Sequence, residues 1–388
     1  MTNPGTAACV QEIMQEFARL TGLDPISSSP RRYLWTDAFA VCNYLELYRR
    51  TGDASYRDLA VRLVDQVHHI LGRHRDDDPR KGWISALPEQ EGERHPTVGG
   101  LRIGKDRNER MPGEPLDERG EWDRDGQYYH YLTKWMHALN RVSRVCGDPV
   151  YTRWAVELAR TAHARFTFVP AAGGPKRMVW KMSIDLSYPL VPSMGLHDPL
   201  DGLVTCSELQ STMDSIPGSS LPDLHTETAE MAELCRRQDL ATDDPLGIGG
   251  LLFDASRIAQ LMRQGRFAYP DLLERVLESA LQGVRIVERS RQLQLPAGYR
   301  LAFRELGLSI GMKGLDASKG MIEESRGEFG TLVQRTVADL MHYQPLAGEI
   351  EQFWLDEANR RAGTWTEHRE INMVMLATSL APDGFITI

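Results

Sequence analysis

Acidic and aromatic side chains gather at the start of several predicted helices, a combination that suits the chemistry of sugars. Trp35 and Asp37 open one such helix, and Asp123, Asp125 and Tyr128 lie at the start of another. Flat rings stack on the C–H faces of a sugar, while carboxylates accept hydrogen bonds from its hydroxyls. Two carboxylates in different surroundings can also divide the roles of acid and base. The sequence therefore indicates carbohydrate chemistry at helix N-termini.

The element that positions these side chains is a helical hairpin. Residues 35–56 and 122–151 each begin with Trp and Asp, continue as a helix and end in a Gly-Asp-x-x-Tyr turn. Helical periodicity predicts about twelve long helices, joined by alternating short and long connections. We expect six helix pairs that close into an all-α (α/α)6 toroid, forming a single domain over residues 1–388. An open solenoid is the structural alternative, and the lack of a fixed repeat period speaks against it.

Two segments depart from the helical pattern. Residues 74–121 are rich in Gly, Pro and charge, and we expect a long ordered lid or cleft wall there. Residues 168–194 alternate in polarity around Gly173 and Gly174, which predicts a small β-hairpin. Both segments should lie at the active-site end, where the N-termini of the inner helices point. Helix N-termini favour polar or anionic ligands.

The composition argues against several classes of protein. A net charge of −9 disfavours a nucleic-acid binder. There is no run of about twenty apolar residues, so no membrane span is expected, and no secretory signal is visible, so we expect a cytoplasmic protein. The five cysteines lack CxxC spacing, which favours reduced thiols. No metal or cofactor is expected, because HExxH and phosphate-loop motifs are absent; Gly247–Gly250 indicates close helix packing instead.

The candidate site residues are all predicted to lie at the start of inner helices. The acids that stand out are Asp125, two residues after Asp123, and Asp201, within the first turn of its helix, and the histidines that stand out at such helix starts are His197 and His368. For the acids the alternative is a capping or solvated role, and Asp198 and Asp244, each before a proline, are predicted N-caps. For His197 and His368 the alternative is a surface position without a catalytic role. The expected substrate contacts are Trp35, Asp37, Trp122, Asp123, Tyr128, Tyr129, His130, Arg300 and Trp365.

The unit W-T-D-x-F…L-x-x-Y-x-x-T-G-D-x-x-Y at residues 35–56 resembles the first inner hairpin of the six-hairpin glycosidase superfamily, in particular the unsaturated glucuronyl hydrolases. The segments at residues 125–128 and 200–203 are similar to the starts of that family's next two inner helices. The resemblance implies a hydrolase of a small oligosaccharide or uronide. It assigns the acid to Asp125 and the base or stabiliser to Asp201.

A second resemblance points to a different reaction. Residues 195–201 (GLHDPLD) and 365–369 (WTEHR) are similar to helix starts in the N-acylglucosamine 2-epimerase and cellobiose epimerase group. This implies, as the alternative function, sugar 2-epimerisation by His197 and His368. A non-catalytic helical scaffold is the third possibility. Either enzyme would have a small carbohydrate as its partner, and the sequence indicates no particular oligomeric state.

Overall fold

The structure is a computed structural model that describes residues 4–216, 218, 221–324 and 329–388. Helices make up most of it, and the strands are short. The chain divides into two compact units, Thr21–Gln238 (the N-terminal unit) and Met1–Leu20 with Asp239–Ile388 (the C-terminal unit). The expectation of a single domain stays a prediction. Within the described ranges, no helix has both the length and the apolar character needed to cross a membrane.

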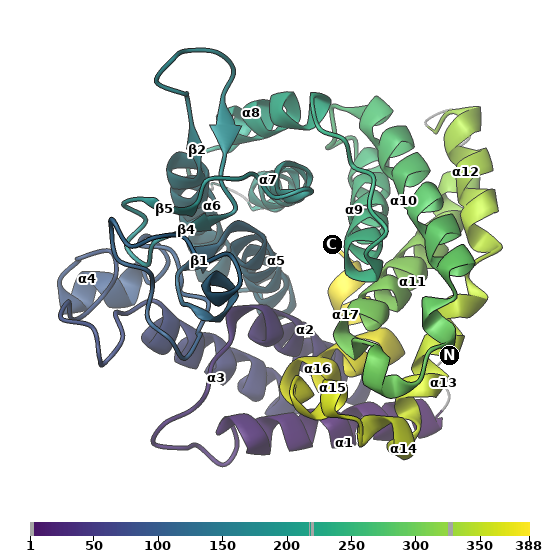
Figure 1. Ribbon diagram of the computed structural model, residues 1–388, viewed down its shortest axis with the longest axis horizontal. Helices are drawn as coiled ribbons and strands as arrows, with labels where there is room; N and C mark the ends of the chain where they lie inside the picture. Colours follow the sequence, from purple (N-terminus) through teal and green to yellow (C-terminus); the bar gives the residue numbers. More distant parts are fainter. Residues whose placement is uncertain (1–3, 217, 219–220, 325–328) are drawn as a thin grey trace. The chain divides into compact units, whose positions relative to one another are not determined.

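The N-terminal unit consists mainly of helix pairs (Figure 1). The pairs are α2 (Leu34–Thr51) with α3 (Ala54–Leu71), α5 (Tyr129–Cys146) with α6 (Val150–Phe166), and α7 (Asp198–Ser215) with α8 (His225–Arg236). Helix α5 packs against both α2 and α7. Gly52 and Gly147 end the first helix of two pairs in left-handed conformation, each at φ 72°, which suits glycine. The two predicted hairpins are thus confirmed.

Short strands lie between these helix pairs. Strands β1 (Gln127–Tyr128), β4 (Lys181–Met182) and β5 (Pro189–Val191) form an antiparallel sheet in the order β1-β4-β5. Strands β2 (Thr167–Phe168) and β3 (Arg177–Met178) form the hairpin predicted around Gly173. Figure 1 shows its loop extending away from α6 and α8. Strand β1 leads directly into α5, so the sheet fixes where that helix begins.

The segment of residues 74–121 is held in place by buried anchors. Trp83, Ile84, Leu101 and Ile103 are all buried, as expected from their apolar character. The segment contains α4 (Glu89–Arg94) and the beginning of the 3-10 helix η1 (Gly120–Asp123). Arg102 donates hydrogen bonds to the carbonyl oxygens at the end of α3 and just beyond it. The segment is therefore packed onto α3.

The C-terminal unit is built around α11 (Ala302–Glu324), which packs on α9 (Pro245–Arg263), α13 (Pro345–Leu355) and α16 (Arg369–Leu380). Helix α10 (Pro270–Ser290) packs between α9 and α12 (Thr331–Met341). The remaining elements are α1 (Pro4–Thr21), whose last residue belongs to the N-terminal unit, α14 (Glu357–Arg360), α15 (Gly363–Thr366), α17 (Asp383–Ile386), η2 (Gln292–Gln294) and η3 (Ala297–Tyr299).

Glycines bring α9 and α11 into close contact. A Cβ atom on Gly249 would lie 2.1 Å from the carbonyl oxygen of Gly307, and one on Gly311 would lie 2.4 Å from that of Gly249. The close packing expected of residues 247–250 is confirmed. Helix α11 continues past Gly311 and Gly314 to Glu324, because these glycines admit a neighbouring helix instead of ending their own.

We expect Gly249→Ala to lower the free energy of unfolding by about 1–3 kcal/mol, because the added methyl group overlaps the backbone of α11. Gly250→Ala is the matched control. A Cβ atom there would meet nothing within 4 Å, and alanine favours a helix. Urea unfolding of both variants measures the difference. Equal stabilities would contradict the close contact.

Candidate functional site

The first turn of α7 carries two carboxylates of the N-terminal unit, Asp198 and Asp201, both buried. Pro199 follows Asp198 and favours the start of a helix, because its ring fixes φ. The prediction that Asp198 caps this helix is wrong. His197 occupies the N-cap position, and Oδ2 of Asp198 has no hydrogen-bond partner. The first turn of α7 therefore carries two acids one turn apart, and neither of them is its N-cap.

Asp198 is packed tightly against its surroundings. A Cβ atom on Gly195 would lie 2.3 Å from its Oδ2, so the lack of a side chain there makes room for the carboxyl group. Nδ1 of His130 lies 3.6 Å from its Oδ1. Burial raises the pKa of Asp198 to about 8, and the charge of Asp201 adds to the effect while Lys134 opposes it. Asp198 is therefore protonated at neutral pH.

Asp201 has a different environment. Its Oδ2 accepts hydrogen bonds from Oγ1 of Thr133 at 2.5 Å and from Nζ of Lys134 at 2.6 Å. Both donors lie on α5, and Lys134 is one turn after His130. A buried ion pair with a lysine stabilises the ionised carboxylate. The two acids of α7 thus differ in protonation, which is the arrangement that acid and base catalysis needs.

Aromatic rings surround His130. Tyr128 stacks on it at 5.7 Å with an interplanar angle of 16°, and Trp35 meets it edge-on at 5.9 Å. Trp122 stacks on Trp180 at 5.0 Å, and both rings contact Tyr128. Trp122 is 57% exposed. An open aromatic surface therefore leads to His130 and the carboxylates.

Three buried polar atoms around His130 have no hydrogen-bond partner in the described chain. They are Nε1 of Trp35, the hydroxyl of Tyr128 and Oδ2 of Asp198. Each belongs to a residue that lies against the His130 ring. An unpaired buried polar group costs about 1–3 kcal/mol, so its occurrence calls for an explanation. We call Trp35, Tyr128, His130, Asp198 and Asp201, together with the Trp122–Trp180 stack, the α7 cluster.

Three of the residues predicted for the site are engaged in packing elsewhere in the N-terminal unit. Asp125 is fully buried, and its Oδ2 accepts a hydrogen bond from Arg102 at 2.6 Å while its Oδ1 accepts from two backbone amides. Asp37 accepts from the backbone N–H of Tyr33, and burial raises its pKa to about 6 although Arg32 opposes this. Tyr129 is buried with its hydroxyl 4.0 Å from the sulfur of Met231.

The other predicted residues lie outside the α7 cluster or in the second unit. Asp123 is exposed on η1, and His197 precedes Asp198. In the C-terminal unit, Arg300 is buried in a double hydrogen bond with Glu305, and Trp365 is buried and stacked on Trp354 at 5.6 Å. His368 is exposed and meets Phe303 edge-on at 5.5 Å. The catalytic pairing of His197 with His368 stays a prediction.

The sequence analysis missed four residues of this region: Asp198, Thr133, Lys134 and Trp180. Lys134 could have been found, because it lies four residues after His130 and hence on the same face of a helix. Trp180 had no such signal, since its position depends on the pairing of β4 with β1. In the described ranges, no group of three or more His, Cys, Asp or Glu side chains is placed to hold a metal ion.

No family model matches the sequence, and no curated protein matches it either. Solved structures do. The chain is similar to the GH76A alpha-1,6-mannanase from Salegentibacter sp. HEL1_6, with a TM-score of 0.54 and 10% identity over 97% of this chain and 99% of that chain. It is also similar to a GH76 alpha-mannanase from Bacteroides thetaiotaomicron, with a TM-score of 0.53 and 10% identity over 96% of both chains.

A third similar structure is the cellobiose 2-epimerase from Spirochaeta thermophila DSM 6192, with a TM-score of 0.47 and 13% identity over 95% of this chain and 97% of that chain. The likeness to the two mannanases shows the fold. The chain has an all-α (α/α)6 toroid fold, as predicted.

We expect Asp125→Asn to lower the free energy of unfolding by about 3 kcal/mol, because the change leaves the buried Arg102 without its anionic partner. Asp123→Asn, on the exposed η1, is the matched control and should be neutral. Chemical unfolding measures both. Loss of turnover at unchanged stability would instead support Asp125 as the catalytic acid.

We expect Asp198→Asn to become more stabilising as the pH rises. Asp198 keeps its proton up to about pH 8 in the folded protein, whereas in the unfolded chain it ionises near pH 4. Between these values the unfolded state binds fewer protons than the folded state. The free energy of unfolding of the wild type therefore falls by about 1.4 kcal/mol per pH unit relative to that of the variant, and the difference stops growing above pH 8.

Urea unfolding between pH 5 and pH 9 measures this difference, with Asp123→Asn as a control that should follow the wild type. A stability difference that does not depend on pH would show that Asp198 ionises normally in the folded protein.

Proposed function

We propose that the chain is a carbohydrate-active enzyme whose active site is the α7 cluster. The observation that carries this proposal is the set of three unpaired buried polar atoms around His130, next to the open Trp122–Trp180 surface. Sugar hydroxyls both donate and accept hydrogen bonds, so a bound sugar ring can satisfy all three atoms. Its C–H face can stack on the exposed indole at the same time.

The reaction that these residues support best is hydrolysis of a glycosidic bond. Protonated Asp198 donates its proton to the glycosidic oxygen as the C–O bond breaks, and the leaving sugar departs as an alcohol. Ionised Asp201, held by Lys134, stabilises the positive charge on the sugar or takes a proton from the attacking water. The water oxygen bonds to the anomeric carbon, and proton exchange with solvent restores Asp198.

The charges near the α7 cluster favour a neutral oligosaccharide over a uronide. Lys134 is paired with Asp201, Lys181 with Glu121, and Arg102 with Asp125. Cations paired in this way offer little to a sugar carboxylate. An inactive variant of the similar mannanase, with two consecutive aspartates replaced, was solved with alpha-1,6-mannotetrose.

A second candidate function is sugar 2-epimerisation, favoured by the state of His130. Burial lowers the pKa of His130, and Lys134 adds to the effect, so the imidazole is neutral at pH 7. A neutral imidazole can remove a proton from the carbon next to a sugar carbonyl. Asp198 lies beside this ring, with Oδ1 3.6 Å from its Nδ1. The imidazole, protonated by the first step, then returns a proton to the other face of the planar intermediate after that intermediate has turned over.

The test is turnover of a panel of mannose- and glucose-containing oligosaccharides. Hydrolysis predicts new reducing ends, a loss of about 100-fold or more in kcat for Asp198→Asn, and activity that falls above about pH 8 as Asp198 loses its proton. Asp123→Asn should keep full activity. Epimerisation predicts solvent deuterium at C2 of a reducing sugar, lost on His130→Gln. If neither product forms, or if Asp198→Asn is fully active, the proposal fails.

A further inference from the structure

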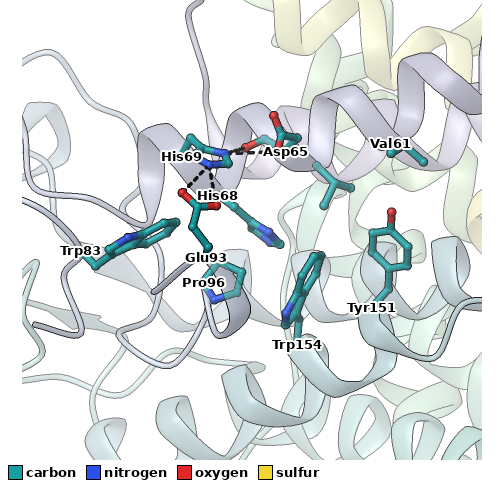
Figure 2. A pocket seen from close by; sticks show the side chains of 10 residues that line it. Val61, Asp65, His68, His69, Trp83, Glu93, Pro96, Tyr151 and Trp154 are labelled. Carbon is teal, nitrogen blue, oxygen red and sulfur yellow. Dashed lines mark hydrogen bonds and ion pairs between the residues drawn. The ribbon is translucent and has the colours of Figure 1, made fainter. Parts of the chain in front are cut away.

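A cavity of about 120 Å³ lies in the N-terminal unit beside α3, and none of its lining residues belongs to the α7 cluster. Figure 2 shows side chains from α3, from the segment of residues 74–121 and from α6 arranged around it. The lining residues used here are Asp65, His68, His69, Glu93, Tyr151 and Trp154. The cavity combines aromatic walls with carboxylates and imidazoles.

His68 presents a hydrogen-bond donor that the protein leaves unused. Nε1 of Trp135 donates to Nε2 of His68 at 3.1 Å, and an indole N–H can only donate, so Nε2 must be the acceptor. Burial lowers the pKa of His68 to about 3, and the neutral ring therefore carries its proton on Nδ1. Among the described residues, Nδ1 has no hydrogen-bond partner, although His68 is only 3% exposed and lines the cavity.

Carboxylate groups also line the cavity. The ring of His69 is held between Asp65 and Glu93, with Nδ1 3.2 Å from Oδ1 of Asp65 and Nε2 2.9 Å from Oε2 of Glu93. The dashed lines in Figure 2 mark these contacts. The hydrogen bond of His69 Nδ1 is to the backbone carbonyl oxygen of Asp65, at 2.8 Å. Both carboxylates therefore keep acceptor capacity, because an ionised carboxylate has about four lone-pair sites. The cavity thus offers carboxylate acceptors together with the unused donor of His68.

The Trp154 ring forms a fixed aromatic wall. Its Nε1 donates to the carbonyl oxygen of Arg94 at 2.9 Å. The ring meets His68 edge-on at 5.0 Å and Tyr151 edge-on at 5.3 Å. Because the Trp154 ring is already held by this hydrogen bond and by His68 and Tyr151, it loses little conformational freedom when a ligand stacks on it.

We propose that this cavity is a second carbohydrate-binding site, which holds one pyranose unit. A sugar hydroxyl accepts from Nδ1 of His68, neighbouring hydroxyls donate to Asp65 or Glu93, and the ring face lies on Trp154. An anion does not fit, because two carboxylates face it. An organic cation that carries no acceptor group would leave the His68 N–H unpaired, whereas a sugar hydroxyl can accept from it. The inference goes beyond the proposed reaction and does not depend on it.

The test follows the eight tryptophan indole N–H signals by NMR while pyranoses are added. D-mannose, D-glucose and N-acetylglucosamine are the probes, and sorbitol is the matched polyol without a ring. The signal of Trp154 is assigned from its absence in Trp154→Phe. We expect a saturable shift of this signal with each pyranose that binds and none with sorbitol. Signals of Trp122 and Trp180 report the α7 cluster separately, so the two proposals can fail independently.

Two variants complete the test. Trp154→Ala should weaken pyranose binding by about tenfold or more, whereas Trp154→Phe keeps an aromatic face and should stay within about threefold of the wild type. Both variants lack Trp154, so binding to them is followed by the indole signal of Trp83, which also lines the cavity. Thermal melting confirms that both variants are folded. The inference is overturned if no pyranose shifts the Trp154 signal, if sorbitol shifts it equally, or if folded Trp154→Ala binds as tightly as the wild type.

Discussion

A carboxyl group that is taken out of water keeps its proton unless a cation or several donors stabilise the charge. The first turn of α7 contains one carboxyl group in each state, protonated and ionised. Asp198 is buried against His130 without a donor, so it stays protonated. Asp201, one turn later, is held ionised by Lys134 and Thr133. One helix start therefore carries an acid and an anion side by side. The proposed chemistry depends on this difference.

Neighbouring helices pack around the start of α7 and place side chains beside its two acids. Helix α5 packs against both α2 and α7, and its first two turns supply His130, Thr133 and Lys134. Asp125 contributes by position: it holds Arg102, while the backbone N–H of Ile103 donates to the carbonyl oxygen of Gly126. The segment of residues 74–121 is thereby tied to the strand that precedes α5. The ion pair of Asp125 is thus part of what fixes the location of His130.

The sequence was sufficient for the helix pairs, because periodicity and Gly-Asp turns are local signals. Several residues that the sequence placed at different helix starts do come together, since Trp35, Trp122, Tyr128, His130 and Asp201 lie in the α7 cluster. It could not rank the acids. Asp125 and Asp198 both look exposed at a helix start, and only the fold shows that Arg102 neutralises one while nothing neutralises the other.

The same reason explains what the sequence does not specify in the C-terminal unit. Arg300 has the residue type of a substrate contact, but Glu305 lies five positions later and takes up its guanidinium. The glycines of α11 have the residue type of a helix end, but α9 packs against them. Burial and pairing are tertiary properties, and no local pattern specifies them.

The most direct test of the account is a crystal structure of the Asp198→Asn variant soaked with a neutral oligosaccharide that the wild type turns over. The account predicts a sugar ring stacked on the Trp122–Trp180 pair, with hydroxyl or glycosidic oxygens within hydrogen-bond distance of residue 198, the Tyr128 hydroxyl and Nε1 of Trp35. An oligosaccharide bound away from these atoms, with the α7 cluster left empty, would contradict it.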